Sequence, residues 1–137
     1  MKRRMLFTVS ILAAAGVLAQ TSVAVAQETA TVFIKPTGEL LGSGEAAVVR
    51  LRGSCEPPFE VLEANLSLSQ GPFISGFTGT SGFPCDGKLH KDLVTVPADE
   101  GTSFREGEAF ASAFLLLIDP ATDETEEAQA TRTIRLR

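Results

Sequence analysis

The eight residues LEANLSLS, Leu62 to Ser69, alternate between apolar and polar side chains without a break. The apolar residues of this stretch are Leu62, Ala64, Leu66 and Leu68. Successive side chains of a β-strand point to opposite faces of a sheet, so a period of two predicts a strand with one buried and one solvated face. We therefore expect all four apolar residues to face a core.

The same period continues in both directions along the chain, and Gly or Pro interrupts it about every ten residues. The pattern predicts an all-β protein of about seven antiparallel strands, arranged as an immunoglobulin-like β-sandwich. Two features of immunoglobulin domains are missing, since the chain has neither Trp nor Tyr and Cys85 stands beside a turn. The expected strands are residues 30–35, 47–52, 62–69, a short irregular one in a long loop within 71–84, 89–96, 107–118 and 128–137.

The most apolar of these stretches is residues 107–118. Both parities are apolar there: Phe110, Phe114, Leu116 and Ile118 on one, and three alanines and two leucines on the other. A strand that is apolar on both sides is typical of a central position with both faces covered. We expect this strand to be buried on both faces.

The N-terminus has the layout of a secretory signal peptide. Lys2-Arg3-Arg4 is positively charged, residues 5–19 are apolar, and Ala24-Val25-Ala26 is a small-x-small cleavage site. The pattern predicts a signal peptide over residues 1–26, with cleavage between Ala26 and Gln27, and a single mature domain over residues 27–137. No later stretch reaches the roughly 18 apolar residues of a transmembrane helix. The expected product is secreted, either free outside the cell or associated with the cell wall.

The net charge of the expected mature chain disfavours some classes of binding partner. Removal of residues 1–26 takes away three of the twelve basic residues and none of the seventeen acidic ones, so the formal charge changes from −5 to −8. A net negative protein is repelled by nucleic acids and anionic membranes. The composition argues against both as nonspecific partners.

Two cysteines, Cys55 and Cys85, allow one pairing. An even number of cysteines in an exported chain predicts a disulfide. Closing a loop of about 31 residues stabilises a fold by roughly 3.5 kcal/mol on the chain-entropy model. A metal-binding or redox pair would need Cys-x-x-Cys spacing or neighbouring histidines, and His90 is the one histidine of the chain. The pair is therefore predicted to be structural, tying strand ends and loops together at one end of the fold, with no metal and no cofactor.

A series of short motifs runs through the mature part in a fixed order. It consists of Cys55, Ser69-Gln70-Gly71, Cys85-Asp86-Gly87, His90, Val94-Thr95-Val96, Gly101, Phe104, Gly107 and the run Ala109-Phe110-Ala111-Ser112-Ala113. In this order the chain resembles a family of small secreted actinobacterial proteins of unknown function. The resemblance implies a secreted β-sandwich and supplies no activity. It breaks at Asp92, where that family is expected to have an aromatic residue.

Catalytic motifs are weak. His90 with Asp92 and a nearby hydroxyl would be the elements of a hydrolase, because an imidazole is the usual base for a hydroxyl nucleophile. The segment Gly79-Thr80-Ser81-Gly82-Phe83 is the nearest approach to a nucleophile elbow. It lacks the second glycine at the required place and precedes a turn instead of a helix. We expect no catalytic residues, and a His90 that is hydrogen-bonded near the disulfide.

Charged side chains gather in two places. One cluster is acidic and consists of Asp119, Asp123, Glu124, Glu126 and Glu127. It lacks the Asp-x-Asp-x-Asp-Gly sequence of a calcium-binding loop, so we expect a solvated acidic hairpin. Arginines share the outward parity of two strands, Arg50 with Arg52 and Arg135 with Arg137. A sandwich would place these pairs on opposite sheets, as two small solvated patches.

Phe73, Phe77 and Phe83 lie among glycines in the expected long loop. A flexible loop that presents aromatic rings is a candidate binding site for an apolar ligand or partner. The alternative is that these rings plug the end of the sandwich and support the disulfide. Polysaccharide is not favoured as the ligand, because sugar-binding platforms rely on Trp and Tyr.

These patterns together predict a secreted, non-enzymatic binding or interaction module with a cell-envelope or extracellular partner. A carrier of a small apolar ligand, held in the sandwich cleft or under the aromatic loop, is the alternative. A small secreted hydrolase is the third possibility.

Overall fold

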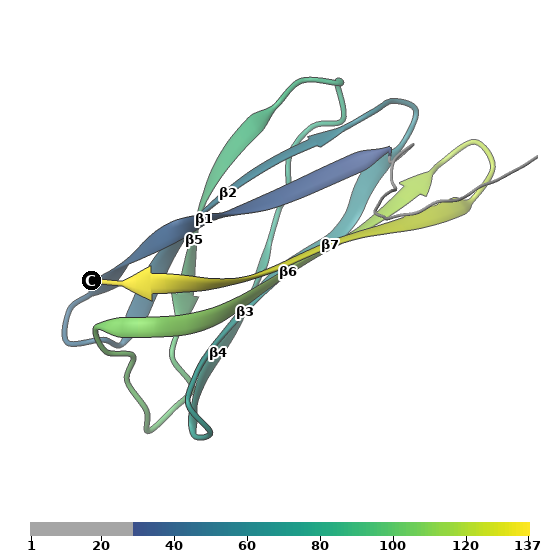
Figure 1. Cartoon of the computed structure of the whole chain (residues 1–137). Helices are drawn as coiled ribbons and strands as arrows, with labels where there is room; N and C mark the ends of the chain where they lie inside the picture. The colour runs from purple at the N-terminus through teal and green to yellow at the C-terminus, as the bar shows by residue number, and fades with distance from the viewer. Residues whose placement is uncertain (1–28) are drawn as a thin grey trace, which may run out of the picture.

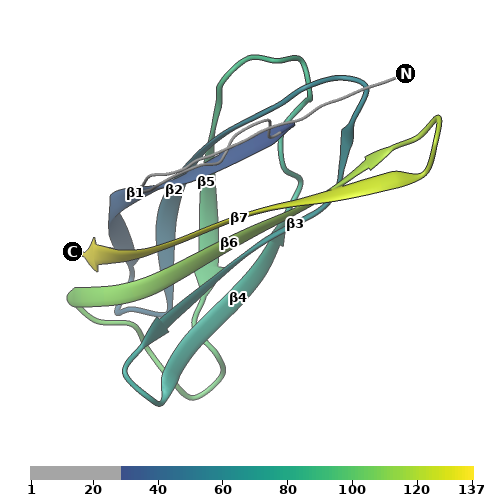
Figure 2. The ribbon, with the colours of Figure 1, turned by 45° about the vertical axis from the view of Figure 1, so that its right-hand side comes forward.

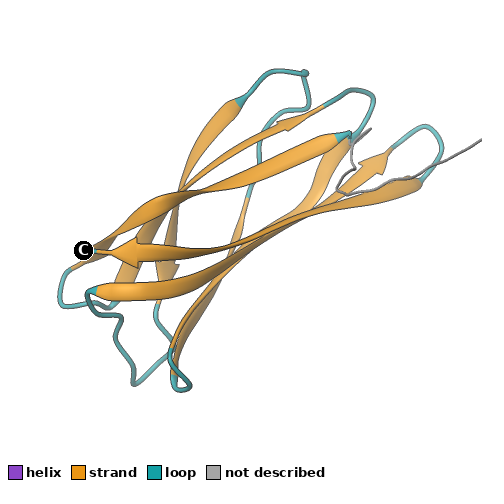
Figure 3. Cartoon of the chain, viewed as in Figure 1, coloured by secondary structure: helices purple, strands orange, loops and turns teal. Residues whose placement is uncertain are grey.

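The structure is a computed structural model that describes residues 29–137 (Figure 1). The predicted signal peptide and its cleavage site between Ala26 and Gln27 lie outside the described residues. The described part has seven strands and no helix (Figure 3), which confirms the all-β class. The strands are β1 (Ala30–Leu41), β2 (Ala46–Cys55), β3 (Glu60–Gln70), β4 (Ile74–Thr80), β5 (His90–Pro97), β6 (Gly107–Asp119) and β7 (Glu124–Leu136).

All seven strands belong to one sheet, in the order β4-β3-β6-β7-β1-β2-β5. The sheet curls until its two edge strands face each other, so that β1, β2 and β5 form one side of the roll and β7, β6, β3 and β4 the other (Figures 1 and 2). The shape is nearly that of a barrel. Neighbouring strands are antiparallel except β1 and β7, which are parallel. The expectation of purely antiparallel strands is therefore wrong at this one contact.

Strand β1 joins the two sides because its register shifts in the middle. It pairs with β2 along its whole length, with an irregularity between Ile34 and Gly38 that contains Pro36, a residue without an N–H for the ladder. After this irregularity β1 also contacts β7, and the amide of Leu40 donates to the carbonyl of Arg137 (3.1 Å). A Cβ on Gly38 would lie 2.9 Å from a methyl of Leu136 and 3.0 Å from the carbonyl oxygen of Val48, so glycine favours the close approach of β1 to both neighbouring strands.

Before the irregularity, β1 and β7 separate, and one arginine bridges them. Nη1 of Arg132 donates to the carbonyl oxygen of Ile34 (3.0 Å), and its guanidinium lies 5.2 Å from the centroid of the Phe33 ring. A guanidinium carries five N–H donors and stacks well on aromatic rings. Arg132 thus replaces the ladder bonds that the diverging strands no longer make.

The core fills the inside of the roll, and β6 supplies small side chains to it. Ala113 lies opposite Leu66 and Ala111 opposite Leu68, so small and large residues alternate across the inner face. A second, smaller cluster lies near the disulfide and contains Ala30, Cys55, Phe59 and Leu117. The main cluster consists of Ile34, Ala47, Val49, Leu51, Leu66, Leu68, Val94, Val96, Phe104, Ala109, Ala111, Ala113, Ile134 and Leu136.

One residue of the stretch 62–69 does not face this core. Ala64, Leu66 and Leu68 are buried as predicted, but the side chain of Leu62 is 58% exposed. The register between β3 and β6 shifts between Val61 and Glu63, which leaves Leu62 without a partner. An extra residue in one strand is a β-bulge, and it reverses the faces of the residues on either side. The prediction for Leu62 is therefore wrong.

The prediction that residues 107–118 are covered on both faces is also wrong. On the outer face of β6, Phe110 is exposed, and Phe114, Leu116 and Ile118 are partly exposed. Within residues 29–137, the single rolled sheet has its core on the inner side, and no helix or second sheet covers the outer side. The alanines of β6 therefore face inward and its phenylalanines face outward.

Residues 71–84 are also more regular than expected. Strand β4 pairs with β3 at all seven of its positions. Its Gly76 forms an isolated antiparallel bridge with Ala98, and a Cβ there would overlap the carbonyl oxygen of Pro97. Gly76 thus lets the two edges of the sheet meet without breaking the strand.

Candidate binding surfaces

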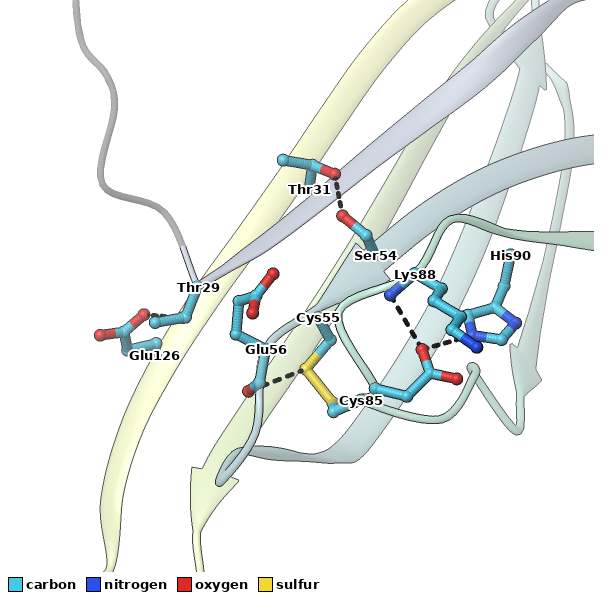
Figure 4. The surroundings of a disulfide bond; sticks show 10 residues. Thr29, Thr31, Ser54, Cys55, Glu56, Cys85, Lys88, His90 and Glu126 are labelled. Carbon is cyan, nitrogen blue, oxygen red and sulfur yellow. Dashed lines mark hydrogen bonds and ion pairs between the residues drawn. A yellow bond between two sulfur atoms is a disulfide. The ribbon is translucent and has the colours of Figure 1, made fainter.

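The predicted disulfide is present. Cys55 ends β2 and Cys85 lies in the connection between β4 and β5, with their Cα atoms 4.3 Å apart (Figure 4). Cys55 is fully buried, and the half-buried Phe83 packs on the same cluster. The bond ties a strand end to a loop, as expected, and it indicates an oxidising environment.

Hydrogen bonds hold the loop that follows Cys85. The amide of Gly87 donates to the carbonyl of Cys55 (2.9 Å). Oδ1 of Asp86 accepts from the amide of Lys88 (2.9 Å) and lies 2.8 Å from Nε2 of His90 (Figure 4). The hydrogen bond from His90, followed by that from the Lys88 amide, lowers the pKa of Asp86 below its usual value.

His90 does not form a hydrolytic set with Asp92. Its imidazole pairs with Asp86 and stacks on Phe83, with ring centroids 6.1 Å apart and planes at 17°. Oδ2 of Asp92 accepts instead from the hydroxyl of Thr80 (2.9 Å). Among residues 29–137 no hydroxyl is hydrogen-bonded to the imidazole. This arrangement ties His90 to the loop beside the disulfide.

The interior offers little space. A cavity of about 10 Å³ lies between the two sides of the roll, among residues that include Thr80, Phe83, His90 and Asp92. This volume is about that of one water probe. It is far below the roughly 300 Å³ of the smallest usual ligand sites.

The structure does not bring the three phenylalanines of the candidate loop together. Phe73 lies at the turn between β3 and β4 and is 84% exposed, whereas Phe77 lies on the outer face of β4 and is 59% exposed. Phe83 is half-buried beside His90 and Gly53. Phe83 therefore supports the disulfide region, as the alternative hypothesis predicts. Phe73 and Phe77 are exposed at separate places.

Phe77 shares the outer face of β4, β3 and β6 with two other phenylalanines, both on β6. Phe77 lies opposite Ser67, and Ser67 lies opposite Ser112 of β6. Phe110 and Phe114 flank Ser112 on the same outward parity. We call this surface the aromatic face; it consists of Phe77, Phe110 and Phe114 with the small residues Ser67, Ser69 and Ser112 between them.

Sequence reasoning missed Phe110 and Phe114 because it assigned both to a covered strand. A signal was present in the alternation of phenylalanine with alanine at residues 109–114. A tightly rolled sheet has less room inside than outside, so the smaller residues of such a strand face the core.

The acidic segment forms the turn between β6 and β7. Asp119 is nearly buried, and its Oδ1 accepts from the amide of Ala121 (3.0 Å) while Glu124 and Glu127 are exposed. The hydroxyl of Thr29 donates to Glu126. Residues 29–137 contain no group of three or more His, Cys, Asp or Glu side chains placed to hold a metal ion.

Arg50 and Arg52 lie on the outer face of β2, and the adjacent strands add two more cations. Lys35 of β1 and Lys91 of β5 line the same hollow of about 420 Å³. Arg135 does not line this hollow, but it lies opposite Thr37 of β1 in the same sheet, so the expectation that the two arginine pairs belong to opposite sheets is wrong. The alternation within β2 predicts that Arg50 and Arg52 lie on the same face. That Lys35 and Lys91 lie beside them depends on the order of the strands in the sheet.

Comparisons with known proteins add no family. No protein-family model, no curated protein and no solved structure matches the chain. The resemblance to secreted actinobacterial proteins stays a prediction. No helix that could cross a membrane is found in the part of the chain that the structure describes.

Proposed function

We propose that this protein is a secreted, non-enzymatic binding module that acts at or outside the cell surface, and that it binds an envelope or extracellular partner through the aromatic face. The signal-peptide pattern of residues 1–26 and the disulfide between Cys55 and Cys85 support export. The aromatic face supports binding.

The observation that carries the proposal is the exposure of Phe77 and Phe110. Phe110 is 49% exposed, in a strand whose opposite face carries alanines. Large exposed apolar surfaces are uncommon on monomeric proteins and mark sites of interaction. Rings held on paired strands lose little conformational freedom on binding, so more of the contact energy is retained.

We also infer that the roll is a variant of the immunoglobulin-like sandwich. With the strands lettered A, B, C, C′, E, F and G in chain order, the pairs β2–β5, β3–β6 and β6–β7 are the B–E, C–F and F–G pairs of that fold. Strand β1 then takes the place of strand A and links the two sides. The aromatic face lies on strands C′, C and F in this lettering.

The two alternatives have weaker support. A carrier would need an enclosed site, and the cavity between the two sides holds about 10 Å³, whereas the hollow of about 480 Å³ beside Phe73 is open to solvent. A hydrolase would need a hydroxyl nucleophile beside the imidazole of His90, and among residues 29–137 no hydroxyl is hydrogen-bonded to it. The exposed aromatic face favours the binding module over both.

The test is the distribution of variants in cultures of the producing cells, between medium and salt-washed wall. We expect the wild-type protein to stay on the wall and its N-terminal residue to be Gln27. The double variant Phe77→Ser with Phe110→Ser should instead be found in the medium. Phe73→Ser is the matched control, because Phe73 is more exposed but lies at the turn beyond the aromatic face.

All variants should keep the thermal midpoint of the wild type, since exposed side chains contribute little to stability. Equal retention of the double variant and the wild type would contradict a role of the aromatic face. Retention of an uncleaved chain inside the cell would contradict export.

A further inference from the structure

The hollow on the outer face of β1, β2 and β5 concentrates positive charge on an acidic protein. Residues 29–137 contain nine basic and sixteen acidic side chains. One carboxylate, Asp92, lines this hollow and accepts from the hydroxyl of Thr80. Four of the nine basic side chains line it as well: Lys35, Arg50, Arg52 and Lys91. We call these four residues the cationic hollow. It lies on the opposite side of the roll from the aromatic face (Figure 2).

The strand register sets the spacing of the four charges. Arg52 lies directly opposite Lys91, and Arg50, two residues away on the same strand, lies opposite Leu93. Adjacent strands are about 4.8 Å apart, and alternate residues of a strand are about 6.6 Å apart. The four cations therefore lie across three strands within a span of roughly 10 Å.

This arrangement is unfavourable for the isolated protein. Like charges directly opposite each other in a sheet destabilise it. Arg50 has a partner in Glu39, 3.4 Å away, but both side chains are more than half exposed. Within the described residues, Lys35, Arg52 and Lys91 form no ion pair. With sixteen carboxylates among residues 29–137, the missing partners of these three cations point to a negative group from outside.

We propose that the cationic hollow binds an extended acidic segment of another protein, with carboxylates at alternate residues. Alternate side chains of an extended chain lie on one face at a spacing of about 6.6 Å, which equals the spacing of Arg50 and Arg52. The exposed side chain of Leu93 supplies an apolar contact between the charges. The strongly acidic remainder of the surface repels a broad polyanion such as a nucleic-acid duplex, but a single extended chain meets only the hollow.

The test measures binding of synthetic peptides to the intact mature protein by calorimetry at low and at physiological salt. The first probe is a dodecapeptide that alternates Glu and Thr, and the second has the same composition with all Glu in one block. We expect the alternating peptide to bind at least tenfold more tightly than the block peptide, and to weaken as salt screens the charges. Equal binding of the two peptides would overturn the proposal.

Variants locate the site. We expect Arg52→Glu with Lys91→Glu to weaken binding of the alternating peptide at least tenfold. Arg105→Glu removes an exposed arginine from the connection between β5 and β6, beside Gln70 of β3, and should leave binding unchanged. If Arg105→Glu weakens binding as much as the double variant does, net charge and not the hollow is responsible, and the proposal fails.

A stability measurement separates binding from damage to the fold. Lys91→Glu alone replaces a repulsive cross-strand pair by an attractive one, so it should raise the thermal midpoint by about 1–4 °C while it weakens binding. A lowered midpoint would mean that the four cations stabilise the sheet, against the proposal.

Two further outcomes are decisive. Tighter binding of a heparin oligosaccharide or of polyphosphate than of the alternating peptide would assign the hollow to another class of polymer and overturn the acidic-segment proposal. The Phe77→Ser and Phe110→Ser variant should bind the alternating peptide like the wild type. This inference therefore stands or falls independently of the aromatic face.

Discussion

Removal of the disulfide should lower the stability of this protein strongly. The perturbation is Cys55→Ala together with Cys85→Ala, which leaves no free thiol in the mature chain. The bond spans a sequence separation of 30 residues. On the chain-entropy model this corresponds to about 3.5 kcal/mol of unfolding free energy.

The loss can be expressed as a shift in the thermal midpoint. Unfolding entropy is about 2.1 cal/mol/K per residue, so a domain of this size loses roughly 4 °C for each kcal/mol. We expect the double variant to unfold about 15 °C below the wild type. Circular dichroism during heating measures this, and urea unfolding at constant temperature gives the free energy directly.

Two controls make the result interpretable. Wild-type protein with a reductant should show nearly the same loss, because the entropy of the unfolded chain and not the alanine side chains causes it. A loss below about 1 kcal/mol in both experiments would refute the reasoning. It would mean that hydrogen bonds such as the one from Gly87 to Cys55 hold the loop, with the disulfide contributing little.

Two further predictions concern the bulge in β3 and the loop after Cys85. Leu62→Ser should change the unfolding free energy by less than about 0.5 kcal/mol, whereas Leu66→Ala should lower it by about 2–5 kcal/mol. The reason is that Leu66 is fully buried and Leu62 is not. Equal losses of the two variants in urea unfolding would contradict the bulge. The pKa of Asp86 is lowered from 3.8, so its carboxylate stabilises the fold fully above about pH 4, and this contribution disappears as the pH falls through the lowered pKa. Asp86→Asn should therefore lower the thermal midpoint at pH 6, and this loss should shrink as the pH falls below about 4. A loss that is the same at every pH would show that the charge of Asp86 is irrelevant.

The sequence predicts where the strands lie, but it predicts less well which strands pair and which side chains face the core. Alternation at residues 62–69 and 128–137 depends on each residue and its immediate neighbours, so it identifies strands directly. The bulge at Leu62 is set by pairing with β6, which is far away in the sequence. Similarly, the parallel contact of β1 with β7 follows from the shift around Pro36, and no local pattern indicates it.

The candidate sites show the same division. The disulfide could be predicted because two cysteines allow one pairing. Phe77 could be recognised as a binding candidate, but its neighbour Phe110 could not, since the choice between inner and outer face of β6 depends on the curvature of the whole sheet. The cationic hollow combines residues of three strands, and only the order β1-β2-β5 brings Lys35 and Lys91 to Arg52.

The meeting of the sheet edges has a consequence for solubility. Free strand edges are templates for aggregation, because their unpaired amides and carbonyls pair with other chains. Here the edge strands β4 and β5 are linked at both ends: Asp99 donates its amide to Ser75 (2.8 Å), and Thr80 donates its hydroxyl to Asp92 (2.9 Å). Each edge thus shields the other, and the protein gains much of the protection of a closed barrel without a continuous ring of hydrogen bonds.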